Sequence, residues 1–354
     1  MADSAEHDNE WQAAATTVLQ AYEIDAFELK RITQGLVNLT IEVTGRGGKR
    51  CILQRLNSVF DESVNHNIDA VTTHLAGKGM ITPHLIRTRS GDLGVEHGDE
   101  IWRLLSFIEG RTLNRVEHSG QAGEAGSLLG RFHASLLDFD EVLHVTRPPI
   151  HDLQRHFARL RALLVDHADH RLHGVVSDLA VRLEGLRQKY RAPILGDPRL
   201  VHGDPKISNV LFAADEDVAR CMIDLDTLTR MPLALELGDA FRSWCNPLGE
   251  DHPQAVFDLG LFEAALEGYA RAARNFLTPD EISAIAPAML EIYFELAARF
   301  LADAMEETYF AWDATRYATR GDHNLARARG QISAARSLAG KFDAAERLTS
   351  QILN

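Results

Sequence analysis

The hydrophobic periodicity changes once along the chain, and this change restricts the fold more than any other feature. From Phe27 to Arg103, short apolar runs are separated by glycine-containing turns, which is typical of short β-strands, with one helix inserted. From about Ser127 onward, apolar residues recur at helical spacing over long stretches. A chain of 354 residues is also longer than a usual single domain. We therefore predict an α+β protein of two lobes, a small β-rich lobe over residues 1–108 and a larger, mainly helical lobe over residues 109–354.

Within the smaller lobe, we expect an N-terminal helix that ends near Ile24 and then a sheet of five strands. Apolar and polar residues alternate over 39–43, and the apolar run at 51–54 follows the turn GRGG at 45–48, which predicts a hairpin. Apolar residues at helical spacing predict the inserted helix over residues 62–75. Two further apolar segments complete the sheet, at 85–86 and 101–105.

In the larger lobe, helical patterns cover residues 127–139 and 151–190, and three more helices are expected after Pro253, Pro279 and Asp322. One non-helical segment, residues 198–232, interrupts them. Its apolar triplets at 210–212 and 221–223 predict a short hairpin.

Composition excludes several classes of function. The formal net charge of −14 argues against a general role at nucleic acids or membrane surfaces, which require an excess of Lys and Arg. The three cysteines are widely spaced and form neither a disulfide framework nor a CxxC metal pair. The N-terminus lacks the basic start and apolar run of a signal peptide, and no apolar stretch is long enough to span a membrane. We expect a cytoplasmic protein; its oligomeric state stays open.

The non-helical segment contains the string HGDPKISN, residues 202–209. Its Asp204 follows a His by two residues and precedes Asn209 by five, a spacing that protein-kinase catalytic loops use. Phosphoryl transfer needs a carboxylate to orient the attacking hydroxyl, an oxygen ligand for the metal, and cations around the phosphates. Asp204, Asn209 and Lys206 are candidates for these three roles, with Asp204 and Lys206 the catalytic pair.

A second acidic motif follows 15 residues after Asn209, where Met222 to Asp226 read MIDLD. Asp224 is placed like the metal-binding Asp of the kinase DFG motif, and Asp226 either assists it or braces the turn. Mg²⁺ keeps several waters and bridges nucleotide phosphates, so Asn209 and Asp224 are sufficient as protein ligands. Either motif alone is compatible with a surface turn, because Asp, Gly, Pro and Asn are common turn residues. Their order and spacing together favour a kinase that uses ATP and Mg²⁺.

At these residues the chain resembles the aminoglycoside phosphotransferase and choline kinase superfamily, which has a protein-kinase-like fold. Within it, the N-acetylhexosamine 1-kinases are the most similar. This narrower resemblance rests on segments in both lobes, at residues 51–71, 102–110, 223–227, 237–242, 298–310 and 322–332.

The resemblance implies that Asp204 is the catalytic base and that Asn209 and Asp224 hold Mg²⁺. It also implies a hinge beside the adenine, formed by Ser106, Phe107, Ile108 and Glu109. The acceptor would be a sugar, and phosphorylation of its anomeric hydroxyl would convert an N-acetylhexosamine to the 1-phosphate.

The chain also departs from kinase patterns. Only Gly35 represents the glycine-rich loop, and Gln54 stands where protein kinases have a Lys on the third strand, as it does in the hexosamine kinases. Because Gln carries no charge, Arg55 or Lys206 must neutralise more of the phosphate charge. Leu36 replaces a His of the hexosamine kinases, and Asp69 stands where their helix has a Glu.

Several residues of the larger lobe have two interpretations. Asp239 is expected to brace the catalytic loop by accepting backbone hydrogen bonds. Arg299 and Asp303 lie four residues apart on a predicted helix, so they form either a surface ion pair or part of the sugar site. Tyr309 either stacks on a sugar ring or belongs to the core, as does Phe310.

Competing functions remain open after these observations. Another alcohol, such as an aminoglycoside, choline or homoserine, is an alternative acceptor. A catalytically silent nucleotide-binding protein is a rival from another class, suggested by Gln54, although Asp204, Asn209 and Asp224 argue against it.

Overall fold

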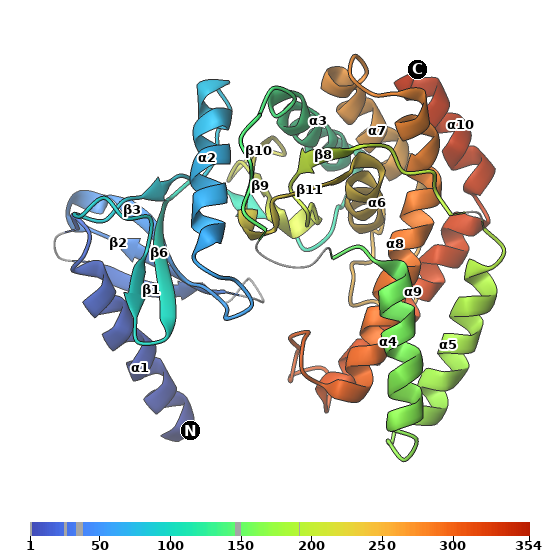
Figure 1. Ribbon diagram of the computed structural model, residues 1–354, viewed down its shortest axis with the longest axis horizontal. Coiled ribbons are helices and arrows are strands. Elements are labelled where there is room, and N and C mark those ends of the chain that lie inside the picture. Colours follow the sequence, from blue (N-terminus) through green and yellow to red (C-terminus); the bar gives the residue numbers. More distant parts are fainter. Residues whose placement is uncertain (1, 25–26, 33–37, 146–149, 191) are drawn as a thin grey trace. The chain divides into compact units, whose positions relative to one another are not determined.

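The computed structural model describes residues 2–24, 27–32, 38–145, 150–190 and 192–354. The chain forms two compact units, residues 1–109 with 138–148, and residues 110–137 with 149–354 (Figure 1). The first unit is built on an antiparallel sheet, and the second consists mainly of helices. The predicted α+β class, with a small β-rich lobe and a larger helical one, is confirmed.

The sheet of unit 1 has the strand order β1-β2-β3-β6-β4, and β5 pairs with β6. The strands are β1 (Glu28–Ile32), β2 (Leu39–Thr44), β3 (Arg50–Arg55), β4 (Leu85–Ile86), β5 (Val95–His97) and β6 (Glu100–Ser106). The predicted hairpin is confirmed as β2 and β3, which pair over their full length. Five strands were expected, and β5 is the sixth. It has only three residues and pairs with β6 across a tight turn at Gly98, whose φ of +63° suits glycine.

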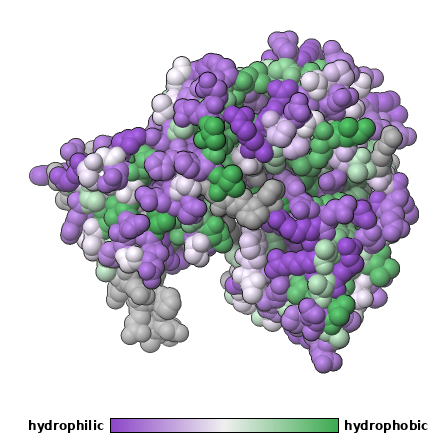
Figure 2. Space-filling model, viewed as in Figure 1, coloured by the Kyte–Doolittle hydropathy of each residue, from purple (hydrophilic) through white to green (hydrophobic). Residues whose placement is uncertain are grey.

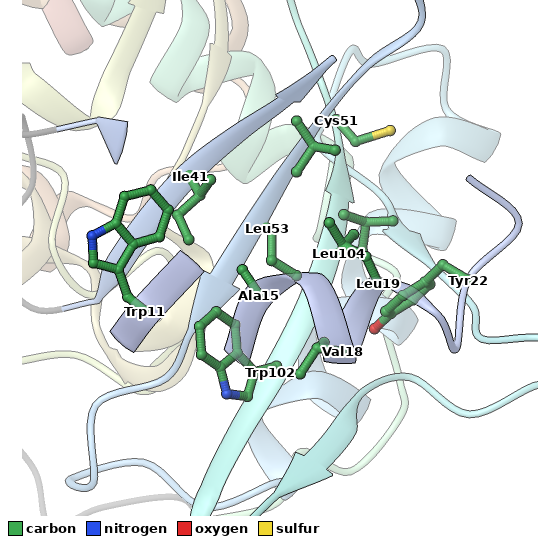
Figure 3. Packing of buried hydrophobic residues seen from close by; sticks show 11 residues of the cluster. Trp11, Ala15, Val18, Leu19, Tyr22, Ile41, Cys51, Leu53, Trp102 and Leu104 are labelled. Atoms are coloured by element: carbon green, nitrogen blue, oxygen red, sulfur yellow. The ribbon is translucent and has the colours of Figure 1, made fainter. Parts of the chain in front are cut away.

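Helix α1 (Ala2–Leu19) covers one face of this sheet (Figure 3). Its Ala15, Val18 and Leu19 pack in one buried cluster with strand residues Leu53 and Leu104. Because successive side chains of a strand point to opposite faces, the neighbours of these strand residues point away from α1. Helix α2 (Ser63–Gly77), which confirms the inserted helix, contributes a side chain to that opposite face.

Unit 2 contains eight helices in the described part of the chain. They are α3 (Ser119–Ser135), α4 (Leu153–Asp166), α5 (His173–Arg187), α6 (Leu233–Trp244), α7 (Leu259–Ala273), α8 (Pro279–Glu306), α9 (Arg320–Ala339) and α10 (Phe342–Leu353). The single helix expected over 151–190 is two, because the chain turns between Asp166 and His173. Helices α6 and α10 were not expected. Nearly every residue of α6 is buried, so it lacks the polar face that reveals a helix in sequence.

The predicted non-helical segment is confirmed between α5 and α6. It contains β8 (Pro198–Val201), β9 (Val210–Phe212), β10 (Ala219–Met222) and β11 (Thr229–Pro232). Strands β9 and β10 form the expected hairpin, and β9 also pairs with β7 (Arg111–Thr112). Strand β8 pairs with β11, so the loop after β8 and the loop before β11 start from neighbouring strands. These two loops carry the HGD and IDLD motifs.

The visible surface of both units is mostly hydrophilic, with hydrophobic residues in small separate patches (Figure 2). Among the described residues, no helix combines the length and the apolar character needed to cross a membrane.

Candidate active site

The HGD loop adopts a backbone conformation that only glycine fits at its centre. Gly203 has a φ of +85°, and a Cβ atom there would lie 2.1 Å from the backbone oxygen of Thr227. Thr227 in turn donates from its hydroxyl to the backbone oxygen of His202 over 2.7 Å. The loop and the turn after Asp224 therefore pack backbone against backbone.

His202 ties the same two segments together from inside. Its Nε2 lies 2.9 Å from the backbone oxygen of Ile223, which can only accept, so this nitrogen carries the proton. The other ring nitrogen then accepts from the backbone N–H of Asp204 over 3.3 Å. The buried His202 thus fixes the Asp204 backbone relative to the IDLD strand.

Glu236 of α6, and not the expected Asp239, braces the catalytic loop. Its two carboxylate oxygens accept from the backbone N–H groups of His202 at 3.0 Å and Gly203 at 2.9 Å, and the side chain is fully buried. Asp239 instead accepts two hydrogen bonds from the Arg242 guanidinium, so the assignment to Asp239 was wrong. Asp239 lies one helical turn further along α6 and finds a cation on its own helix. A lone Glu within the apolar run LALEL was the sequence signal for Glu236.

The structure brings Asp204, Lys206 and Asn209 into direct contact. Asp204 Oδ2 lies 2.5 Å from Lys206 Nζ and accepts from Asn209 Nδ2 over 3.1 Å. The same Asn209 nitrogen donates to the backbone oxygen of Asp204 at 2.8 Å. Because the amide nitrogen faces Asp204, the amide oxygen of Asn209 is turned away and is available as a ligand. Trp244 supports the loop by donating to the backbone oxygen of Pro205.

The charges of this cluster determine the protonation of Asp204. Burial raises the pKa of Asp204, but the charge and hydrogen bond of Lys206, with the charges of His202 and Arg242, together hold the pKa below its usual value. Burial likewise lowers the pKa of Lys206, and the charges of Asp204 and Asp224 reverse this, leaving the pKa raised. The side chain of Asp204 is 26% exposed and that of Lys206 is 32% exposed, so both groups can be reached from solvent. An ionised carboxylate that remains accessible is suited to accept a hydrogen bond from a hydroxyl.

Asp224 sits in a strained backbone conformation beside Asn209. It has a φ of 63° and a ψ of 56°, the left-handed region that non-glycine residues rarely adopt. The backbone N–H of the preceding Ile223 donates to the backbone oxygen of Asn209, which places the two residues on adjacent segments. Burial, followed by the charge of Asp226, raises the pKa of Asp224. Strain and accumulated negative charge at one carboxylate are typical of a site that completes itself with a cation.

The donor set near Asp224 fits a hard divalent cation. It offers the Asp224 carboxylate and the Asn209 amide oxygen, and Mg²⁺ prefers such oxygen ligands. In the part of the chain that the structure describes, no three His, Cys, Asp or Glu side chains group so as to hold a metal by themselves. A cation bound through Asn209 and Asp224 would therefore need water and phosphate oxygens as further ligands.

In unit 1, Gln54 and Arg55 point to opposite faces of the sheet. Gln54 Oε1 accepts two hydrogen bonds from the Arg103 guanidinium. Arg55 pairs with Glu100 at 2.6 Å and lies over the Trp102 ring on the α1 side. Asp69, expected to correspond to a helix Glu, forms an ion pair with Arg87 at 2.5 Å. Gly35 and Leu36 lie outside the described residues.

The predicted hinge segment lies at the end of unit 1. Ser106 closes β6, where its hydroxyl accepts from the backbone N–H of His84. Arg50 holds the next residues, because its guanidinium lies 3.6 Å from the centre of the Phe107 ring and 2.7 Å from Glu109 Oε2. Ile108 lies between these two contacts.

The candidate acceptor residues lie at the end of α8 and in the loop after it. Asp303 is buried, and its carboxylate accepts from the backbone N–H groups of Thr308, Tyr309 and Phe310. It thus shapes this loop, and the predicted Arg299–Asp303 ion pair is wrong because Arg299 faces Glu295 at 3.8 Å. Arg299 also lies over the Tyr309 ring, which is 58% exposed and not part of the core.

Further ionisable side chains lie beside this loop. The Glu295 carboxylate that faces Arg299 lies 3.1 Å from His151 Nδ1. Burial raises the pKa of Asp239. The charges of Arg242 and His151 oppose this rise, and the charge of Asp204 adds to it. The side chains of His151 and Glu295 are nearly inaccessible to solvent. Buried ionisable side chains thus lie next to Arg299, which itself lies over the exposed ring of Tyr309.

Comparison with known proteins identifies the scaffold. Residues 28–276 match the family model described as the phosphotransferase enzyme family, APH. A homoserine kinase of Rhodopseudomonas palustris is 26% identical over 257 residues, which are 72% of this chain and 73% of the relative.

Solved structures share the fold at low sequence identity. The microcompartment-associated aminopropanol kinase superposes with a TM-score of 0.62 at 16% identity, covering 93% of this chain and 98% of that one. The amicoumacin kinase hAmiN, solved in complex with AMP-PNP, Ca²⁺ and Ami, gives a TM-score of 0.61 at 14% identity and covers 94% and 96% of the two chains. The match of the family model spans both the sheet of unit 1 and the HGD and IDLD motifs.

Proposed function

Because this chain belongs to the phosphotransferase enzyme family and is a small-molecule kinase, we propose that it transfers the γ-phosphoryl group of ATP to a sugar. The proposed acceptor group is the anomeric hydroxyl of an N-acetylhexosamine, and the product is its 1-phosphate. The observation that carries the phosphoryl-transfer part is the contact of Asp204 with Lys206 and Asn209, next to a strained Asp224.

In the proposed reaction, Asp204 accepts a hydrogen bond from the acceptor hydroxyl and thereby aims its oxygen at the γ-phosphorus. The new P–O bond forms as the bond between the γ-phosphorus and the β,γ-bridging oxygen breaks, and ADP leaves with the electron pair. The hydroxyl proton passes to Asp204. Because Lys206 keeps the pKa of Asp204 low, proton transfer is expected late, when the acceptor oxygen has become acidic by bonding to phosphorus.

Further residues have proposed roles in binding the phosphates, the metal and the adenine. Lys206 offers a cation to the transferred phosphoryl group, and Asn209 and Asp224 would hold Mg²⁺. Bound there, the metal would neutralise charge on the phosphates. Gln54 would donate to the phosphates, and Ser106 to Glu109 would contact the adenine. The complex of hAmiN with AMP-PNP and Ca²⁺ supports an adenine nucleotide and a divalent cation for this fold.

The sugar part of the proposal is supported by the exposed Tyr309 and by Arg299 beneath it. An aromatic face next to a charged group is suited to stacking on a pyranose ring while hydrogen bonding to its hydroxyls. Asp303 would act indirectly, because its backbone contacts fix the position of Tyr309.

A second candidate acceptor is homoserine, since the relative from Rhodopseudomonas palustris is a homoserine kinase. Arg299, whose side chain is partly exposed, would face the carboxylate of an amino acid, and the buried Glu295 beside it would add negative charge near the ammonium. Acceptors with a single cationic group, such as choline, would be repelled by the partly exposed Arg299 guanidinium.

A panel assay separates these acceptors. Purified protein with Mg²⁺ and ATP is offered N-acetylglucosamine, N-acetylgalactosamine, homoserine, choline and an aminoglycoside, and ADP release is measured. We expect turnover on an N-acetylhexosamine, with the product identified as a 1-phosphate by phosphorus NMR. Turnover on homoserine and on none of the hexosamines would replace the sugar proposal with the second candidate.

A further inference from the structure

Three polar side chains form a row across unit 1 on the sheet face opposite α1. Thr40 of β2 is paired in register with Gln54 of β3, and Gln54 is paired with Arg103 of β6. Leu53 and Leu104, the adjacent residues on these strands, belong to the buried cluster with α1, so the row points away from that cluster. Residue 54 is the position at which a protein kinase would carry its phosphate-binding Lys.

Arg103 holds the Gln54 side chain in one orientation. Its Nε and Nη2 donate to Gln54 Oε1 over 3.0 and 2.6 Å, so both branches of the guanidinium fork meet a single amide oxygen. Arg103 is only 1% exposed, and its Nη1 donates to Asn65 Oδ1 of α2 over 3.3 Å. Because the Gln54 oxygen is engaged, the Nε2 group with its two hydrogens must point the other way, where it reaches the Thr40 hydroxyl at 3.3 Å.

We propose that Arg103 is the positioning residue that makes Gln54 a phosphate donor, and that its positive charge acts on the phosphates through the Gln54 amide group. This inference rests on the proposed nucleotide binding of unit 1. The buried guanidinium withdraws electron density from the amide oxygen, which polarises the Nε2–H bonds and strengthens their hydrogen bonds to an anion. An unrestrained Gln would present its oxygen and nitrogen equally, and the oxygen would repel phosphate.

The arrangement also explains why position 54 is not a Lys. An ammonium there would face the buried Arg103 guanidinium directly across the strand pair, where like charges destabilise a sheet. The sheet therefore has one cation at this place, and it is carried by β6 instead of by β3.

The test measures binding of AMP-PNP with Mg²⁺ by calorimetry, and the KM for ATP, in Arg103→Met, Gln54→Ala and the double variant. We expect each single variant to weaken nucleotide binding about tenfold, which corresponds to about 1.4 kcal/mol. Since Arg103 acts through Gln54, the double variant should bind as weakly as Gln54→Ala and no weaker. Arg87→Met, which removes a surface guanidinium paired with Asp69 in the same unit, is the matched control and should bind as the wild type does.

Gln54→Glu is the variant that separates positioning from folding. Its carboxylate can still accept from Arg103, so we expect an unchanged or higher melting temperature, but it has no hydrogen to donate and should bind nucleotide at least tenfold more weakly. If Arg103→Met does not fold, Arg103→Lys keeps the charge without the two-branched contact and should show an intermediate loss.

Two results would overturn the inference while leaving the proposed function intact. One is wild-type nucleotide affinity in Arg103→Met or Arg103→Lys. The other is an equal further loss when Arg103→Met is added to Gln54→Ala, because that pattern indicates a general effect on the sheet. Absence of nucleotide binding by the wild type would refute the proposed function itself, and this inference with it.

Discussion

Two carboxylates of one site differ in the direction of their pKa shifts, because their neighbours differ. Asp204 contacts the Lys206 ammonium, whose charge and hydrogen bond, together with the charges of His202 and Arg242, keep the pKa low in spite of burial. Asp224 is governed by burial and by the charges of Asp226 and Asp204, and its pKa is raised. A carboxylate that accepts a hydrogen bond from the substrate hydroxyl must be ionised before the substrate binds. A metal-binding carboxylate can stay in a strained conformation, repelled by neighbouring negative charges, until the cation binds.

Asp224→Asn is expected to stabilise the metal-free protein while abolishing transfer. A carboxyl with a raised pKa in the folded state favours folding fully only below its unfolded pKa, near 3.8, and this contribution is lost as the pH rises through the folded pKa. At neutral pH the charge of Asp224 therefore destabilises the folded protein, and Asn carries no such charge. Asn also tolerates the left-handed backbone. Thermal unfolding without Mg²⁺ should show a higher melting temperature for the variant, and the difference should shrink as the pH falls toward 4.

Asp224→Ala is the control for this prediction, since Ala removes the charge but is strained in the left-handed region. It should melt below Asp224→Asn. A wild type more stable than Asp224→Asn at neutral pH without metal would contradict the account of this carboxylate.

At the scale of elements, helix α6 holds the catalytic loop in place, because a single carboxylate on the helix accepts from two backbone N–H groups of the loop. We expect Glu236→Gln to reduce kcat more than tenfold and to lower the free energy of unfolding by about 2 kcal/mol. The NH2 group of the Gln would face one of the two buried backbone N–H groups, and it cannot accept a hydrogen bond from it. Kinetics and urea unfolding measure the two effects. Glu267→Gln, on an exposed position of α7, should change neither; wild-type kinetics in Glu236→Gln would refute the bracing role.

Helices α3 and α7 approach each other through glycines. A Cβ atom on Gly126 would lie 2.1 Å from the backbone oxygen of Ala265, so the two helices would have to separate. Gly126→Ala should therefore destabilise the protein by about 3 kcal/mol. Gly185→Ala on α5, where nothing lies within 4 Å, should stabilise it by about 0.5–1 kcal/mol. Equal melting temperatures for the two variants would contradict this packing.

At the scale of the whole molecule, the sequence could identify those site residues whose partners lie close to them in the same short segment. The spacing inside HGDPKISN identified Asp204 and Asn209 together as candidates, and they contact each other because they lie five residues apart in one loop. Glu236 and Arg103 could not be found in this way. Their partners lie 34 and 49 residues away, and only the packing of α6 on the loop and the pairing of β6 with β3 bring them together.

The fold was predictable for a related reason. The change from strand to helix periodicity is visible over tens of residues, so the class of each lobe followed from it. Strand β5 and helices α6 and α10 were missed, because a three-residue strand and an almost fully buried helix show little periodicity, and α10 follows α9 closely enough to look like its continuation.

The central claim is that Asp204 orients an acceptor hydroxyl for attack on ATP. The most direct test compares wild type and Asp204→Asn for Mg²⁺-dependent phosphorylation of N-acetylglucosamine and N-acetylgalactosamine, with melting temperatures to confirm folding. We predict product from the wild type on at least one sugar and a loss of kcat of about 10²- to 10⁴-fold in the variant. Equal rates in both proteins would remove Asp204 from the mechanism, and no ATP-dependent product on either sugar from the wild type would contradict the proposed activity.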